Sequence, residues 1–150
     1  MSGQPTVEQV GIILVTHVDY GSALLRAAEF IVGTVQDCAC IQVDASLEVD
    51  ETVARLRDAV DRLSRGQGVL ILTDMFGGTP TNLSLSLLGN RTDVEVLTGV
   101  NLPMLLKVLS NRSASLGSLA KIAIEAGCEG IIAAGEMLRG PLPGSQGAKG

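Results

Sequence analysis

The chain has 150 residues, of which 46% are hydrophobic and 18% charged, a length and composition suited to one globular domain. Its net charge of −5 lacks the basic surface of a nucleic-acid binder and disfavours contact with an anionic membrane. Aromatic residues make up only 2%, which argues against ligands held by aromatic stacking. No membrane span or signal peptide is visible, so we expect a cytoplasmic protein.

Short apolar runs alternate with segments of helical periodicity, and this alternation defines the expected elements. The runs predict strands at residues 10–16, 38–43, 68–73, 93–98 and 130–134. The periodic segments predict helices at residues 21–33, 48–65, 80–89, 103–110 and 114–126. This order predicts an α/β fold, with an open, mainly parallel sheet covered by helices on both faces.

The composition changes only at the two ends of the chain, so we expect a single domain. Residues 1–9 are expected to form an N-terminal extension and residues 10–139 the folded domain. Residues 140–150 are rich in Gly, Pro and Ser and are expected to form a flexible tail.

The single histidine, His17, comes at the end of the first predicted strand. Asp74 follows the third strand, and the turn Gly77-Gly78 begins three residues later. Ligands of open α/β sheets bind at the carboxyl ends of the strands. Right-handed crossovers place the ends of the first, third and fourth strands along one edge. We therefore expect His17, Asp74 and the loop at Asn101 to share that edge.

A histidine and a carboxylate placed together can form a nucleophile. A neutral imidazole has one ring nitrogen free to attack. A carboxylate bonded to the other ring nitrogen fixes the tautomer and stabilises the positive charge that develops on the ring. We therefore assign His17 as the nucleophile and Asp74 as its orienting residue.

The segment Gly77-Gly78-Thr79 is a candidate phosphate site. Pro80 suits the first turn of a helix, and Thr79 is then expected to be its N-cap. Backbone N–H groups at a helix start, approached closely because of glycine, suit a phosphate, and the Thr79 hydroxyl adds a donor. Each signal alone also fits an ordinary turn or a structural histidine. Their convergence on one edge favours phosphoryl transfer to and from His17.

Several other chemistries lack their motifs. The chain has no G-x-x-x-x-G-K-[ST], no G-x-G-x-x-G after a strand, no H-E-x-x-H and no G-x-S-x-G. The cysteines are Cys38, Cys40 and Cys128. Their odd number and apolar contexts predict reduced, buried thiols, and no fourth ligand is spaced for zinc. We expect no metal site.

Two other functions of the same edge stay open. Asp74 could be the phosphorylated aspartate of a signal receiver, which would need Mg²⁺ and an acidic cluster after the first strand. The chain has Thr16-His17 there, with only Asp19 nearby. A flavodoxin-like FMN binder is disfavoured by the few aromatic residues and the missing phosphate loop.

Three motifs occur in a characteristic order. They are Ile-Leu-Val-Thr-His at 13–17, Thr-Asp-Met-Phe-Gly-Gly-Thr-Pro at 73–80 and Thr-Gly-Val-Asn-Leu-Pro-Met-Leu at 98–105. Together they closely resemble the IIA domain of the mannose family of the bacterial sugar phosphotransferase system, over about residues 10–135. The resemblance implies a phosphocarrier that accepts a phosphoryl group from phosphorylated HPr on His17. The IIB component would receive the group next and phosphorylate a sugar during uptake.

The resemblance also implies an assembly and a set of contact residues. It implies a homodimer in which the strand at 130–134 is exchanged between subunits and adds an edge strand to the sheet. Thr16, Met75, Phe76 and Asn101 are expected to line the site or contact a partner. No metal or organic cofactor is implied, and contact with the membrane would be indirect, through the sugar permease.

The chain departs from the family pattern directly after His17. The family usually has glycine at the next position, whereas this chain has Val18 and Asp19. Val18 restricts the backbone, and Asp19 places a negative charge where phosphate would sit. This departure keeps open a regulatory or binding module with the same fold and no onward sugar phosphorylation. No IIB segment follows in the sequence, so we expect the IIB partner to be a separate protein.

Overall fold

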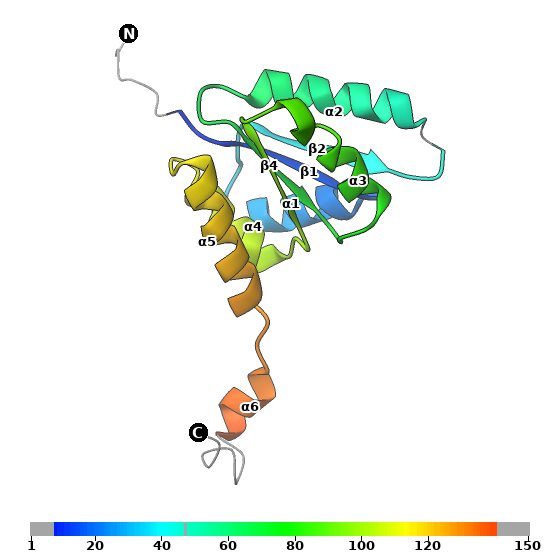
Figure 1. Ribbon diagram of the computed structural model, residues 1–150. Helices are drawn as coiled ribbons and strands as arrows, with labels where there is room; N and C mark the ends of the chain where they lie inside the picture. The colour runs from blue at the N-terminus through cyan, green and yellow to red at the C-terminus, as the bar shows by residue number, and fades with distance from the viewer. Residues whose placement is uncertain (1–7, 47, 141–150) are drawn as a thin grey trace, which may run out of the picture.

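The computed structural model describes residues 8–46 and 48–140 and shows a parallel sheet between two helical layers (Figure 1). The strands are β1 (Gly11–His17), β2 (Cys38–Val43), β3 (Val69–Thr73) and β4 (Val94–Thr98). The helices are α1 (Tyr20–Val32), α2 (Val49–Leu63), α3 (Thr79–Leu85), α4 (Leu102–Leu109), α5 (Leu116–Glu129) and α6 (Ala134–Arg139), with a 3₁₀ turn η1 (Leu88–Asn90). The predicted α/β class is confirmed.

The strand order β2-β1-β3-β4 places the ends of β1 and β3 side by side. All neighbouring strands are parallel, and Val15 of β1 pairs with Thr73 of β3. Strand β2 lies on one side of β1 and β3 on the other, so the direction of winding reverses beside β1. Ligands of open α/β sheets bind at the carboxyl ends of the strands where the winding reverses. His17 and Asp74 therefore lie at the switch point of this sheet.

Each face of the sheet has its own apolar layer, as predicted. The layer toward α2 and α3 includes Ile13, Val15, Leu56, Ile71 and Leu83. The layer toward α1, α4 and α5 includes Ile12, Leu14, Leu70, Leu105 and Leu119. Full burial of such a side chain contributes about 1.5–3 kcal/mol, so the strand ends rest on a firmly packed support.

The helices begin and end near the predicted residues, with a difference in α3. Pro80 lies in its first turn as predicted, but Gly78 is the N-cap and Thr79 is already helical. The helix also ends at Leu85 rather than near Gly89. Two serine hydroxyls in this segment donate to backbone carbonyls, and such local bonds compete with a continuing helix.

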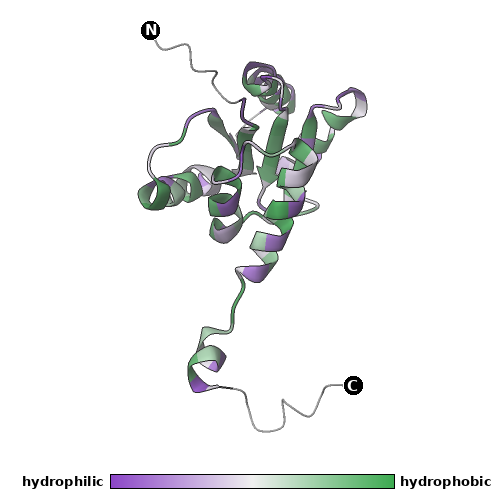
Figure 2. Cartoon of the chain, turned by 90° about the vertical axis from the view of Figure 1, so that its left-hand side faces the viewer, coloured by the Kyte–Doolittle hydropathy of each residue, from purple (hydrophilic) through white to green (hydrophobic). Residues whose placement is uncertain are grey.

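The strand predicted at 130–134 does not form in the single chain. Gly130 caps α5, the next three residues lie outside any strand, and Ala134 begins α6. Residues 131–139, the C-terminal arm, lead away from the body of the domain (Figure 1, Figure 2). A strand needs neighbouring backbone donors and acceptors, and the arm does not lie beside the sheet. The exposed apolar side chains of the arm are Ile131, Ile132, Met137 and Leu138.

The cysteines are free thiols, and two of them are half-buried. Burial raises the pKa of the Cys38 thiol to about 11, with the Arg112 charge opposing the shift, and burial likewise raises the pKa of Cys40. Cys128 is exposed on α5, so the prediction of a buried thiol is wrong there. None of the described helices has the length and apolar character needed to cross a bilayer.

Candidate functional site

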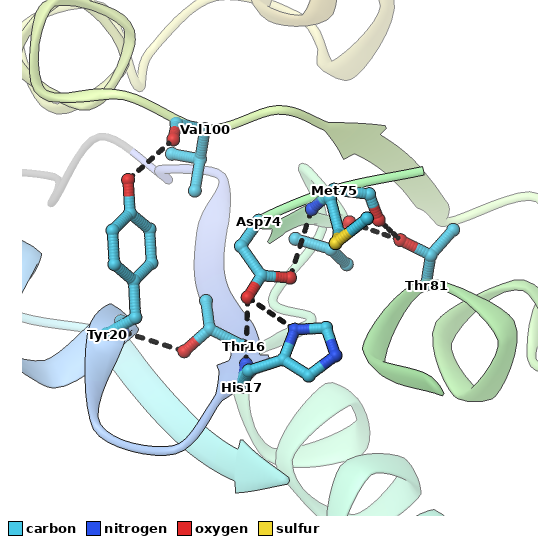
Figure 3. Close-up of polar contacts among 9 residues, drawn as sticks. Thr16, His17, Tyr20, Asp74, Met75, Thr81 and Val100 are labelled. Carbon is cyan, nitrogen blue, oxygen red and sulfur yellow. Dashed lines mark hydrogen bonds and ion pairs between the residues drawn. The ribbon is translucent and has the colours of Figure 1, made fainter. Parts of the chain in front are cut away.

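His17 and Asp74 meet at the carboxyl edge of the sheet (Figure 3). His17 Nδ1 lies 2.7 Å from Asp74 Oδ2, and the His17 backbone N–H donates to the same oxygen at 2.9 Å. The Met75 N–H donates to Oδ1 at 3.0 Å. Both carboxylate oxygens are therefore engaged, and Asp74 is fixed to the backbone as well as to the ring of His17.

Asp74 decides which ring nitrogen of His17 carries the proton. Partial burial acts to raise the pKa of the Asp74 carboxyl, but hydrogen bonds from the His17 backbone and ring outweigh it and lower the pKa. An ionised carboxylate only accepts hydrogen bonds, so Nδ1 must donate. In the neutral ring, Nε2 then has a free lone pair. The His17 side chain is 46% exposed, against 15% for Asp74, so the ring is accessible to a reactant.

The turn after Asp74 passes close to the free side of the His17 ring. A Cβ added at Gly78 would stand 2.9 Å from Cε1 and 3.3 Å from Nε2 of His17, which is closer than carbon atoms normally approach. Gly77 has a φ of 87°, a conformation that glycine adopts without strain. Both glycines therefore serve the close passage of this backbone beside Nε2. Thr79 is exposed at the first position of α3.

The other predicted contact residues fall into two groups. Met75 and Phe76 are exposed on the turn that carries Asp74, with exposed fractions of 55% and 78%. Their apolar side chains are therefore available to a partner that approaches His17.

Thr16 and Asn101 are instead engaged in hydrogen bonds within the fold. Thr16 is buried, and its hydroxyl accepts the N–H of Gly21 at 2.7 Å, which holds the start of α1. Asn101 Oδ1 caps α4 by accepting the N–H of Met104 at 3.0 Å. Its amide also donates to the carbonyl of Gly127 at 3.0 Å. Through these bonds, both side chains fix the helix ends that lie beside the carboxyl edge of the sheet.

Two polar links around the site were missed by sequence reasoning. The Tyr20 hydroxyl donates to the carbonyl of Val100 at 3.2 Å. The Thr81 hydroxyl lies 2.7 Å from Thr73 Oγ1 and 2.5 Å from the carbonyl of Met75, to which it donates. Tyr20 is the single tyrosine of the chain, and this rarity could have marked it for attention. Nothing in the sequence marks Thr81.

The donor set does not favour a magnesium-dependent receiver. Within residues 8–46 and 48–140, no group of three or more His, Cys, Asp or Glu side chains is placed to hold a metal ion. Both oxygens of Asp74 already accept N–H groups. The His17 ring is also the more exposed of the two side chains, at 46% against 15% for Asp74.

Comparison with known proteins identifies the family. Residues 11–124 match the family EIIA-man, described as the phosphotransferase system (PTS) fructose IIA component. The chain belongs to this family. The PTS mannose-specific EIIAB component of Escherichia coli K12 is 29% identical over 124 residues. The match covers 81% of this chain and 38% of that protein, so the chain spans less than half the length of this relative.

Other IIA components match in sequence and in fold. The PTS sorbose-specific EIIA component of Lacticaseibacillus casei is 33% identical over 100 residues, covering 67% of this chain and 72% of that protein. The crystal structure of the EIIA component from Streptococcus agalactiae superposes with a TM-score of 0.77 at 29% identity. That match covers 84% of this chain and 98% of the other. The resemblance drawn from the three motifs is therefore confirmed.

The backbone after the histidine is strained where this IIA component departs from the expected family pattern. Val18 has a φ of 44°, in the left-handed region that a β-branched residue rarely adopts. Its N–H donates to the carbonyl of Val43 at 2.8 Å, which holds the turn between β1 and α1. Glycine adopts this conformation freely, so the usual family residue suits the backbone better than valine. Asp19 precedes α1 and makes no side-chain capping bond.

Proposed function

We propose that this IIA component is a histidine phosphocarrier of a sugar uptake system, and that His17 holds the phosphoryl group. Nε2 attacks the phosphorus of the phosphohistidine of HPr, and the N–P bond to HPr breaks as the bond to Nε2 forms. The His17 ring becomes positively charged, and the Asp74 carboxylate stabilises that charge. The observation that carries the proposal is the Nδ1–Asp74 bond, which leaves Nε2 free.

We assign the binding of the transferred phosphoryl group to the turn Gly77-Gly78-Thr79. Its support is the contact distance between Gly78 and His17 and the exposed hydroxyl of Thr79. Among the described residues, no backbone carbonyl accepts the N–H groups of Gly77 and Thr79 in this turn. Free N–H groups beside Nε2 suit the oxygens of a phosphoryl group.

The turn assignment predicts a steric effect at Gly78. Gly78→Ala adds a methyl group against the His17 ring at a φ that alanine tolerates, so the phosphorylation rate should fall by about 10²-fold, the cost of an approximately 1 Å misplacement. Gly89→Ala is the matched control, because a Cβ there meets nothing within 4 Å. Equal rates for the two variants would remove the turn from the site.

We propose that phosphorylated HPr and a IIB component dock over His17 in turn, against the exposed side chains of Met75 and Phe76. The apolar rim supports this, because docking faces are commonly apolar at their centre. The proposal places the protein in the cytoplasm, where free thiols persist, with contact to the membrane only through the sugar permease.

We also propose a homodimer in which the C-terminal arms are exchanged. Strand β4 is a free edge of the sheet, and edges of this kind are usually paired or covered. The groove beside it is lined in part by Leu85, Val96 and Ile124. The exposed apolar side chains of the arm match this groove in character. Sedimentation equilibrium should find a dimer that Ile132→Asp converts to monomer, and a wild-type monomer would contradict the exchange.

The phosphocarrier role is tested by labelling. Incubation with phosphorylated HPr should produce an acid-labile, base-stable adduct with one phosphate per chain. Because His17 is the only histidine, His17→Ala should abolish it without changing the fold. Normal labelling of His17→Ala would overturn the proposal. Labelling of the wild type without transfer to any IIB component would instead favour the regulatory module suggested by Val18 and Asp19.

A further inference from the structure

We propose that Thr81 is a positioning residue for the transfer reaction. Its hydroxyl bonds the side chain of Thr73 and the carbonyl of Met75, the residues on either side of Asp74, and thereby holds the tautomer of His17. Only the kinetic part of this inference rests on the proposed function, because the tautomer of His17 is measured without phosphorylated HPr.

The direction of the bonds around Thr81 follows from counting protons. Thr81 and Thr73 are both fully buried. Thr81 Oγ1 lies 2.5 Å from the Met75 carbonyl, which only accepts, so the single hydroxyl proton of Thr81 goes there. The Thr73 hydroxyl, at 2.7 Å, must therefore donate to Thr81. One buried oxygen joins the residue before Asp74 to the residue after it.

The two bonds hold the turn that sets the direction of the Asp74 carboxylate. Asp74 Oδ1 accepts the N–H of Met75, whose carbonyl is the group that Thr81 holds. Asp74 Oδ2 accepts both N–H groups of His17. Figure 3 shows these bonds as one continuous set from Thr81 to the His17 ring. A rotation of the turn would break them together.

Thr81 is the buried side chain that connects Thr73 and Met75 in this set of hydrogen bonds. The other support comes through Val100, whose N–H donates to the Thr73 carbonyl at 3.0 Å. Val100 is in turn held by Tyr20, but that bond is longer, at 3.2 Å, and Tyr20 is 43% exposed. Removing the Thr81 hydroxyl would leave the Met75 carbonyl without its donor and the Thr73 hydroxyl without its acceptor. The turn could then recover these bonds only by moving.

The test compares Thr81→Val with Thr81→Ser and with Thr52→Val. Valine keeps the shape of threonine and removes the hydroxyl, whereas serine keeps the hydroxyl. Thr52 is a matched control, because it is equally buried and its hydroxyl donates to the Glu48 carbonyl at 3.0 Å on α2. Thermal unfolding is recorded for each variant to establish that it is folded.

Two measurements are made on each protein. The ring-nitrogen chemical shifts of His17, recorded at about pH 8.5 where imidazole is neutral, report the tautomer. We expect one tautomer, protonated at Nδ1, in the wild type, Thr81→Ser and Thr52→Val, and a mixture of two in Thr81→Val. The rate of phosphorylation by phosphorylated HPr should fall about 10- to 100-fold in Thr81→Val alone, as for other residues that orient a reactive group indirectly.

The outcomes separate the two proposals. A wild type that HPr does not phosphorylate defeats the proposed function, but the ring-nitrogen shifts still decide the role of Thr81. A Thr81→Val protein with the tautomer and rate of Thr52→Val overturns the positioning role. If Thr81→Val does not fold, Thr81→Ala removes the same hydroxyl with a smaller side chain, and wild-type shifts in that variant overturn the inference.

Discussion

The two edges of the sheet use polar side chains in opposite ways. At the amino edge, Arg112 is 4% exposed and donates to the carbonyls of Val10, Gln36 and Asp37, at 2.5 to 3.0 Å. At the carboxyl edge, Nδ1 of His17 bonds Asp74, and Nε2 has no hydrogen-bond partner among the described residues. A polar residue such as Arg112, whose nitrogens are all bonded within the fold, is structural. One that is held firmly but incompletely bonded is a candidate for chemistry.

The comparison is tested most strongly by removing the charge of Asp74. Asp74→Asn keeps the shape, but its NH₂ group must face an N–H donor of His17 or Met75. We expect the phosphorylation rate to fall by about 10²- to 10⁴-fold, as when the carboxylate of a catalytic triad becomes an amide. The free energy of unfolding should fall by no more than about 2 kcal/mol. Both are measured beside Asp58→Asn, an exposed control on α2. A rate within tenfold of the wild type would contradict this view of the carboxyl edge.

The amino edge should respond in the reverse manner. Arg112→Met keeps the length of the side chain but leaves three carbonyls without their donors, so the free energy of unfolding should fall by about 3 kcal/mol. Urea denaturation measures this, with the exposed Arg57→Met as the control. The folded fraction should be phosphorylated at the wild-type rate. A large kinetic defect with little loss of stability would erase the distinction between the edges.

The meeting of His17 and Asp74 could be predicted from sequence because strand ends in a parallel sheet follow from periodicity and topology. Residues His17 and Asp74 end two neighbouring strands, and the hydrogen bond between them agrees with that placement. Periodicity and topology could not decide whether the strand predicted at 130–134 forms. Its apolar sequence satisfies the local pattern, but a strand also needs a neighbour to pair with, and residues 131–139 do not lie beside the sheet.

The supporting bonds of the site escaped prediction for a different reason. Thr81 and Thr73 are eight residues apart on a helix and a strand, and their contact depends on the packing of α3 against β3. Hydroxyl groups leave no periodic signal in the sequence. The departure at Val18 was visible in the sequence, but its consequence required the backbone angle, which shows a strained residue rather than only a bulky one.

This strain gives a smaller test at the carboxyl edge. Val18→Gly relieves a left-handed conformation that costs a bulky residue about 1–3 kcal/mol. Against this gain, glycine makes the unfolded chain more flexible, which lowers the free energy of unfolding by about 0.4–1 kcal/mol. The net free energy of unfolding should rise by about 1 kcal/mol, as measured by urea denaturation. Val18→Ala, which removes the β-branch but keeps a Cβ, should gain less. A Val18→Gly protein less stable than the wild type would show that the reactive edge is not strained there.

The smallest effect concerns an ion cluster at the amino edge. Arg91 bonds Asp93 through two nitrogens at 3.0 Å and also pairs with Asp61. The Arg91 hydrogen bonds lower the pKa of Asp93 to about 2. Since this value lies below that of the unfolded chain, the stabilisation is present above about pH 4 and is lost as the pH falls toward 2.

Arg91→Gln should therefore destabilise the protein at neutral pH and have progressively less effect in acid. Because the Asp93 side chain is 37% exposed, solvent screens the interaction and the loss at pH 7 should stay below about 1 kcal/mol. Unfolding free energies of the two proteins, measured from pH 7 down to about pH 2, should converge as Asp93 protonates. The phosphorylation rate at neutral pH should not change, because the cluster lies at the edge opposite His17. A constant difference across this range would mean that Arg91 acts through packing rather than charge, and that the amino edge is held by contacts that do not titrate.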